Sequence, residues 1–119
     1  MPEGWIGVDL DGTLAEYHGW NGGEIGKPIP AMVERVKKWM RQGLEVRIFT
    51  ARVAASGRTN VDGVVDDKAY AEKVTLQIQG WCIQNIGFVL PVTCQKDFLM
   101  IDLWDDRCHR VETNTGREL

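Results

Sequence analysis

The sequence predicts an α/β fold in which a parallel sheet is covered by helices on both faces. Short apolar runs alternate along the chain with longer segments of helical periodicity, an order typical of strands joined through helices. The first run, Trp5–Leu10, has the continuous apolar character of a strand that is buried on both faces. It stops at polar residues, as strands of an open parallel sheet do at their ligand-binding edge.

The length and composition predict one globular domain that spans residues 1–119. Hydrophobic residues make up 44% of the 119 positions and charged residues 26%, which is close to the ordinary globular mixture. The formal net charge is −3. A protein that grips a nucleic-acid backbone by charge normally carries a basic excess, so the composition weighs against binding to long nucleic acid.

The first half of the chain carries two predicted strands around one helix. Trp5–Leu10 forms the first strand and ends at Asp11. Ala31–Gln42 has apolar residues at helical spacing, and a proline before it and a glycine after it bracket an amphipathic helix. Leu44–Phe49 is the second strand, and Thr50 follows it.

The second half predicts a loop, a helix and further strands. The loop is Val53–Asp67, and the helix that follows is Lys68–Asn85. The buried stripe of this helix is predicted to be Tyr70, Val74, Ile78, Trp81 and Cys82. The later strands are predicted at Phe88–Leu90, Phe98–Trp104 and, as an edge strand before a turn at Asn114–Gly116, Cys108–Glu112. The tryptophans expected in core positions are Trp5, Trp39, Trp81 and Trp104.

The N-terminal segment and the cysteines favour a cytoplasmic protein with no membrane contact. The apolar stretch after Met1 is about five residues, too short for a signal-peptide core or a membrane span. Cys82, Cys94 and Cys108 show neither ligand spacing nor a disulfide framework. We expect all three to be free thiols, buried or half-buried.

Acidic residues follow the first and the last of the four main predicted strands. Asp9 and Asp11 come at the end of the first, and Asp105 and Asp106 come at the end of the fourth. Carboxylates that converge at one sheet edge repel one another unless a cation lies between them. Carboxylate, carbonyl and water oxygens are the ligands that Mg²⁺ prefers, so the pattern predicts a magnesium site and favours phosphoryl transfer.

The order of these residues resembles the four motifs of the haloacid dehalogenase (HAD) superfamily of phosphotransferases. Asp9-Leu10-Asp11-Gly12-Thr13 is similar to its first motif, Thr50 to its second, Lys96 to its third and Asp105-Asp106 to its acidic fourth. The resemblance implies a Rossmannoid three-layer sandwich around a central parallel sheet. The predicted core elements use up the positions between the motifs, so no cap domain is expected. An open site follows, with a homo-oligomer as one way to cover it.

The resemblance also implies a function, that of a Mg²⁺-dependent phosphomonoester hydrolase acting on a small phosphorylated substrate. Asp9 is the expected nucleophile that forms an aspartyl-phosphate, and Asp11 is the expected general acid and base. Thr50 and Lys96 complete the expected catalytic set. The residues expected to hold the phosphate are Gly12, Thr13, Ala51 and Arg52. The expected metal ligands are Asp9, Asp11 through its backbone carbonyl, Asp105 and Asp106.

Several alternatives stay open at this point. Lys68 or Lys73 could replace Lys96 as the motif lysine. Arg52, Arg58 and Arg107 are either anion anchors or solvent-facing residues. The glycine-rich loop with His18, Trp20 and Asn21 lies where a gate over the site would sit. Rival functions are a non-catalytic protein with the HAD fold and a receiver-like protein that binds a phosphoryl group.

Overall fold

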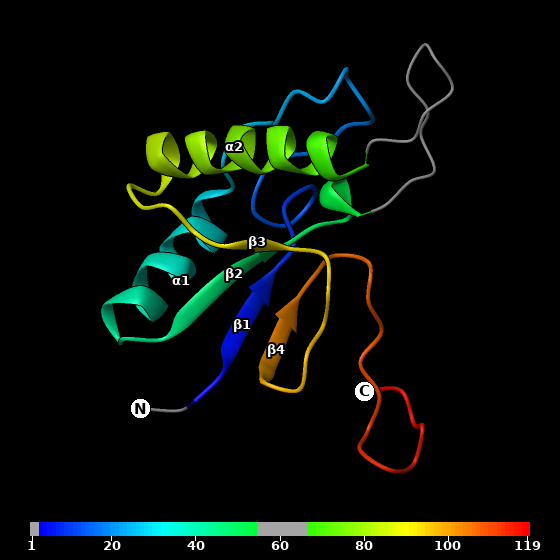
Figure 1. Ribbon diagram of the computed structural model, residues 1–119. Helices are drawn as coiled ribbons and strands as arrows, with labels where there is room; N and C mark the ends of the chain where they lie inside the picture. Colours follow the sequence, from blue (N-terminus) through cyan, green and yellow to red (C-terminus); the bar gives the residue numbers. More distant parts are fainter. Residues whose placement is uncertain (1–2, 55–66) are drawn as a thin grey trace.

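The computed structural model describes residues 3–54 and 67–119 and is built on a four-stranded parallel sheet. The strand order is β3-β2-β1-β4, which places β4 at one edge beside β1 (Figure 1). The strands are β1 (Trp5–Val8), β2 (Glu45–Phe49), β3 (Val92–Thr93) and β4 (Met100–Trp104). The predicted α/β class with a central parallel sheet is confirmed.

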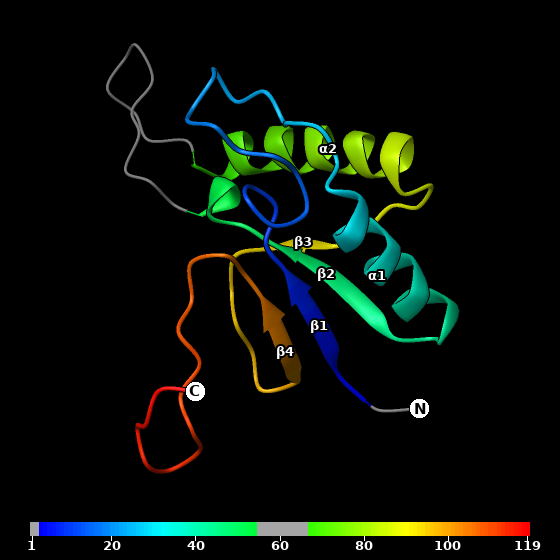
Figure 2. The ribbon, with the colours of Figure 1, turned by 180° about the vertical axis from the view of Figure 1, so that it is seen from behind.

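Two helices link the first three strands and pack on one face of the sheet (Figure 2). Helix α1 (Pro30–Arg41) leads from β1 to β2, and α2 (Asp67–Asn85) leads to β3 after the short helix η1 (Ala51–Val53). Both connections step across the sheet in the same direction, and right-handed crossovers of this kind leave their helices on the same side.

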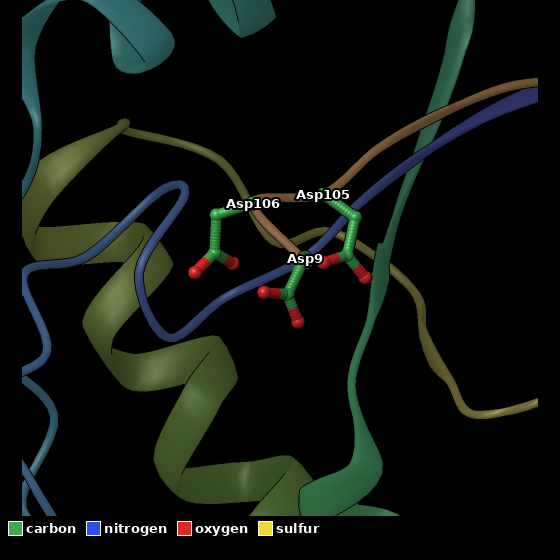
Figure 3. A group of neighbouring side chains, drawn as sticks. All are labelled: Asp9, Asp105 and Asp106. Carbon is green, nitrogen blue, oxygen red and sulfur yellow. The ribbon is translucent and has the colours of Figure 1, made fainter. Parts of the chain in front are cut away.

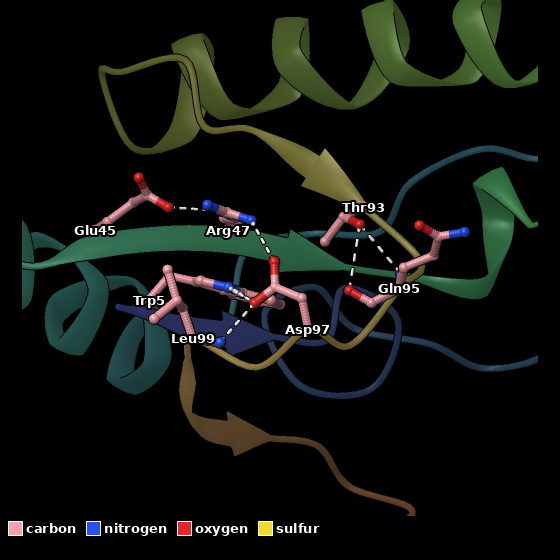
Figure 4. Close-up of polar contacts among 7 residues, drawn as sticks. All are labelled: Trp5, Glu45, Arg47, Thr93, Gln95, Asp97 and Leu99. Carbon is pink, nitrogen blue, oxygen red and sulfur yellow. Dashed lines mark hydrogen bonds and ion pairs between the residues drawn. The ribbon is translucent and has the colours of Figure 1, made fainter. Parts of the chain in front are cut away.

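The opposite face is crossed by residues 94–99, the segment that joins β3 to β4. The Trp5 indole N–H donates to Asp97 Oδ1 at 2.8 Å. The Arg47 guanidinium lies 4.6 Å from the Trp5 ring centroid and bonds to Asp97 and Glu45 (Figure 4). Helices on both faces are predicted by the sequence; in the described residues this crossing segment takes the place of the second helical layer.

The core lies between the two helices and the sheet. Val8 and Ile48 are fully buried register partners, and they pack in one cluster with Val36 of α1 and Ile78 of α2. The predicted stripe of α2 is confirmed, since four of its members are buried and Tyr70 packs against them. Of the four tryptophans expected in the core, Trp5 and Trp81 are buried, while Trp39 is partly buried. Trp104 is 37% exposed because β4 is an edge strand.

The later strands differ from the prediction. The third strand is Val92–Thr93, because Ile48 N–H of β2 pairs with the carbonyl of Pro91 and leaves Phe88–Leu90 outside the sheet. The fourth strand begins at Met100, since the Asp97 carboxylate accepts from Leu99 N–H and closes a turn before it. Cys108–Glu112 forms no edge strand but only a single bridge from Val111 to Glu118. The turn at Asn114–Gly116 is confirmed, with φ of 66° at Asn114.

The structure tests the expected burial of the three cysteines and whether a helix could span a membrane. All three cysteines are free; Cys82 is buried and Cys94 is half-buried, as expected. The prediction is wrong for Cys108, which is exposed because it lies after the edge strand β4 and belongs to no strand itself. Among the described residues, no helix is both long and apolar enough to span a bilayer.

Candidate active site

Three carboxylates meet where β1 and β4 end. The Asp9 N–H donates to the Trp104 carbonyl at 2.9 Å, which extends the pairing of β1 with β4 by one residue. Asp9 therefore stands beside Asp105 and Asp106. One carboxylate oxygen from each of the three residues lies within 4.8 Å of the other two, and Figure 3 shows the side chains directed into the same space. We call them the acidic cluster.

The carboxylates of the acidic cluster are close enough to repel one another. Burial raises the pKa of Asp9 from 3.8 to about 7, and the neighbouring Asp105 and Asp106 contribute to that rise. A cation among the three carboxylates would remove this repulsion. A set of carboxylate oxygens fits a hard divalent ion such as Mg²⁺ better than a softer transition metal.

The turn after β1 seats Asp106. The Thr13 hydroxyl donates to Asp106 Oδ1 at 3.1 Å and accepts from the Asp106 N–H at 3.0 Å. Gly12 has φ of +89°, and a Cβ at this position would lie 2.5 Å from Asp106 Oδ2. Gly12 and Thr13, which the resemblance assigns to the phosphate, thus contact an acidic residue of the cluster in this structure.

Asp11 is turned away from the acidic cluster and paired with Arg52. The guanidinium donates to both carboxylate oxygens, at 2.7 and 2.8 Å, and the Arg52 side chain is only 7% exposed. The Asp11 carboxylate raises the pKa of Arg52. Arg52 also donates to the Gly23 carbonyl at 2.7 Å and lies 5.1 Å from the Trp20 ring centroid. The side chain of Asp11 is therefore not a member of the cluster, and its backbone contact with a metal stays a prediction.

Thr50 and Ala51 lie at the end of β2. Thr50 is 2% exposed, and its hydroxyl accepts from the Arg52 N–H at 3.2 Å, which caps η1. Ala51 lines the cavity above the acidic cluster. The buried hydroxyl thus holds the η1 turn from which Arg52 reaches Asp11.

Lys96 is not brought to the acidic cluster. It is exposed on the crossing segment, outside the lining of the cavity. The next residue, Asp97, is bonded to Trp5 at the start of β1, so the chain runs away from the site. Of the two alternative lysines, Lys73 lines an adjoining hollow, and Lys68 lies elsewhere on α2.

The cavity above the acidic cluster has a volume of about 630 Å³. Its cationic lining residues are Arg52 and Arg107, whereas Arg58 lies outside the described residues. Of the three loop residues expected near a gate, Trp20 lines the cavity and His18 and Asn21 do not.

Sequence reasoning missed three lining residues, which are Tyr17, Phe49 and Tyr70. Phe49 was detectable because it directly precedes Thr50, at the end of a strand that points to the site. Tyr70 had the spacing of a core residue, and Tyr17 had no distinguishing pattern. Their presence shows that aromatic surface surrounds the acidic cluster.

Comparison with known proteins supports the fold and no more. No protein-family model matches the chain, and no curated protein matches it. A solved structure, that of a conserved protein from Bacteroides thetaiotaomicron, aligns with a TM-score of 0.54 at 18% identity. The alignment covers 89% of this chain and 78% of that one. At this identity the likeness extends to the fold alone.

Proposed function

We propose that the chain is a Mg²⁺-dependent phosphomonoester hydrolase of the haloacid dehalogenase type. The observation that carries the proposal is the acidic cluster, whose three carboxylates lie within 4.8 Å of one another at the ends of β1 and β4. They face a cavity that also holds two arginines. An anionic substrate is attracted to arginine, and it can approach three carboxylates only when a cation offsets their charge.

Asp9, Asp105 and Asp106 are the side chains that would hold Mg²⁺. When bound, the ion supplies positive charge that offsets both the carboxylates and the phosphate dianion. The Thr13–Asp106 hydrogen bonds fix one of these ligands in place. Thr13 is thus a positioning residue in this proposal.

Asp9 supplies the nucleophile of the proposed reaction. An oxygen of Asp9 bonds to phosphorus as the bond from phosphorus to the alcohol oxygen breaks, and Asp11 gives that oxygen its proton. Asp11 then accepts a proton from a water molecule. The water oxygen attacks the aspartyl-phosphate and releases inorganic phosphate and the Asp9 carboxylate.

The Arg52–Asp11 pair must open during this cycle. Arg52 occupies both oxygens of Asp11, so Asp11 cannot reach a leaving oxygen while the pair is intact. Arg52 is then free to contact the substrate phosphate, together with Arg107, which also lines the cavity.

A non-catalytic protein that binds phosphoryl groups, receiver-like or not, is the second candidate. The closed Arg52–Asp11 pair favours it, because both carboxylate oxygens of Asp11 accept hydrogen bonds from Arg52 and neither is available to a leaving group. This protein would bind Mg²⁺ and inorganic phosphate but turn over no ester.

The decisive experiment compares turnover of alkyl and nitrophenyl phosphates with Mg²⁺ in Asp9→Asn and Asp11→Asn. We expect Asp9→Asn to lose turnover of both esters because an amide is no nucleophile. Asp11→Asn should lose roughly 10²–10⁴-fold on the alkyl ester and less on the nitrophenyl ester, which leaves without a proton. Asp102→Asn, an exposed acid on β4, is the matched control and should keep full turnover.

Two outcomes contradict the proposal. Turnover that survives in Asp9→Asn excludes Asp9 as the nucleophile. A wild-type protein that binds Mg²⁺ and phosphate but hydrolyses neither ester belongs to the second candidate function.

The remaining expectations complete the proposal. The substrate is a small phosphorylated molecule, and the chain acts in the cytoplasm, in keeping with its three free thiols. A second copy of the chain is an untested candidate for covering the open cavity.

A further inference from the structure

Aromatic rings are concentrated around the acidic cluster. Both tyrosines of the chain line the cavity, together with Trp20 and Phe49. They come from separate parts of the fold: Tyr17 and Trp20 from the loop after β1, Phe49 from the end of β2 and Tyr70 from the start of α2. The fold thus gathers rings from three segments at the one place where the carboxylates also meet.

Two of these rings are exposed, which is costly for large apolar surfaces. Trp20 is 61% exposed and Tyr17 is 47% exposed, and neither is among the described residues that pack against the hydrophobic core. Trp20 is nonetheless held in place, because the Arg52 guanidinium lies 5.1 Å from its ring centroid and also bonds to the Gly23 carbonyl of the same loop. A large aromatic surface that is both exposed and fixed is typical of a ligand platform.

The other residues that line the cavity limit the chemical class of ligand that it can bind. Besides the four rings it consists of four carboxylates, two arginines and Ala51, and among the described lining residues there is no amide or aliphatic hydroxyl side chain. The carboxylates and arginines account for a metal ion and a phosphate. A sugar with many hydroxyls would find few additional partners here, whereas a flat ring would find aromatic faces.

We propose that the preferred substrates are phosphate monoesters whose leaving alcohol carries a planar aromatic ring, which packs against Trp20 and Tyr17. This inference rests on the proposed function, because it assigns the phosphate end to the acidic cluster. The cavity of about 630 Å³ has room for both ends of such a molecule. The ring is recognised by its flat face, so benzene-type rings and nucleobases fit the same description.

The test uses two matched pairs of esters with the full chain and Mg²⁺. Benzyl phosphate and cyclohexylmethyl phosphate are both esters of primary alcohols of similar size, and they differ in the flatness of the ring. We expect kcat/KM to be at least tenfold higher for the benzyl ester. A nucleoside 5′-monophosphate and ribose 5-phosphate form the second pair, which tells a nucleobase from a benzene-type ring.

Single-residue variants identify the side chains that cause the preference for a planar ring. Trp20→Leu and Tyr17→Leu should bring the benzyl-to-cyclohexylmethyl ratio of kcat/KM toward one. Phe98→Leu is the matched control, since Phe98 is fully exposed and lies outside the cavity lining, and it should keep the wild-type ratio. A ratio that is unchanged in both cavity variants would overturn the assignment of the ring to these residues.

Binding measurements distinguish a failure of this inference from a failure of the proposed function. Benzylphosphonate and cyclohexylmethylphosphonate resist hydrolysis, and calorimetry with the wild-type chain and Mg²⁺ should show at least tenfold tighter binding of the benzyl compound. If neither ester is hydrolysed while this preference is present, the proposed function fails and the inference stands. If the wild-type protein hydrolyses and binds both members of each pair equally, the inference is overturned and the proposed function stands.

Discussion

Gly12 is the residue on which the geometry of the acidic cluster most directly depends. Its φ of +89° lies in the left-handed region that favours glycine, and its missing Cβ leaves space for the Asp106 carboxylate. A methyl group there would lie 2.5 Å from Asp106 Oδ2, so one of the two must move. The close approach of Thr13 to Asp106 depends on the same space.

We predict that Gly12→Ala displaces Asp106 and weakens Mg²⁺ binding at least tenfold, as measured by calorimetry. The strained φ should also lower the free energy of unfolding by on the order of 1–2 kcal/mol. Gly19→Ala is the control, because Gly19 also has a positive φ, of 110°, but a Cβ there would meet nothing within 4 Å. Equal losses of Mg²⁺ affinity in both variants would show that Gly12 makes no special room for Asp106.

The individual site residues differ in how far the sequence predicts their positions. Asp9, Asp105 and Asp106 are predictable because they directly follow strands that pair side by side. The Arg52–Asp11 pair depends on how the η1 turn aims the arginine, and no spacing rule encodes that direction. Lys96 has the expected place in the chain order, but the crossing segment carries it away from the site.

Helix α2 connects the core to the site, since it buries one stripe under the sheet and presents Tyr70 to the cavity. Ile78 lies in the middle of its buried stripe and is fully buried. Leu76, two residues earlier, is 71% exposed. The two side chains are of the same size, so they offer a direct measure of what burial contributes to this helix.

Ile78→Ala should lower the free energy of unfolding by about 2–5 kcal/mol, because it removes buried methyl groups and leaves a cavity. Leu76→Ala should change it by less than about 0.5 kcal/mol, since its side chain is already in contact with water. Urea denaturation followed by circular dichroism measures both. Similar losses in the two variants would mean that the buried face of α2 is assigned incorrectly.

Periodicity explains why some elements are predicted well and others are not. Each helix carries an apolar stripe over several turns, so α1 and α2 fall within one residue of the predicted bounds at each end. The two-residue strand β3 has no such pattern, because its position is set by the partner groups of β2 rather than by its own side chains. The alternation of strands and helices predicts a second helical layer, but residues 94–99, which join β3 to β4, are too few for a crossover helix.

For the whole molecule, the proposed binding of Mg²⁺ would be coupled to pH through Asp9. Without metal, the pKa of Asp9 is raised from 3.8 to about 7. Between pH 3.8 and about 7, the Asp9 carboxyl therefore keeps a proton in the folded state that it has lost in the unfolded state. This contribution to stability is fully present below pH 3.8 and is lost as the pH rises through about 7. Mg²⁺ favours an ionised carboxylate, so in the proposed site protons and the metal ion would compete for Asp9.

We predict that Mg²⁺ raises Tm more at about pH 8 than at about pH 5, because the ion must displace the proton of Asp9 at the lower pH. At a concentration one hundred times its Kd, the ion should stabilise the protein by about 2.7 kcal/mol, and a chelator should reverse the gain. Thermal unfolding with and without Mg²⁺ measures this. In Asp9→Asn the pH dependence of the Mg²⁺ effect should be much smaller, and an unchanged dependence would assign it to another group.

The edge position of β4 ties the appearance of the site to the order in which the chain is made. Thr13 and its partner Asp106 are 93 residues apart, and the strand that delivers Asp105 and Asp106 is the last one of the sheet in chain order. A growing chain can form β1, β2 and both helices while two of the three acidic residues are still absent. The nascent protein can thus pack its core before the acidic cluster exists, and the proposed metal site is completed only when β4 docks against β1.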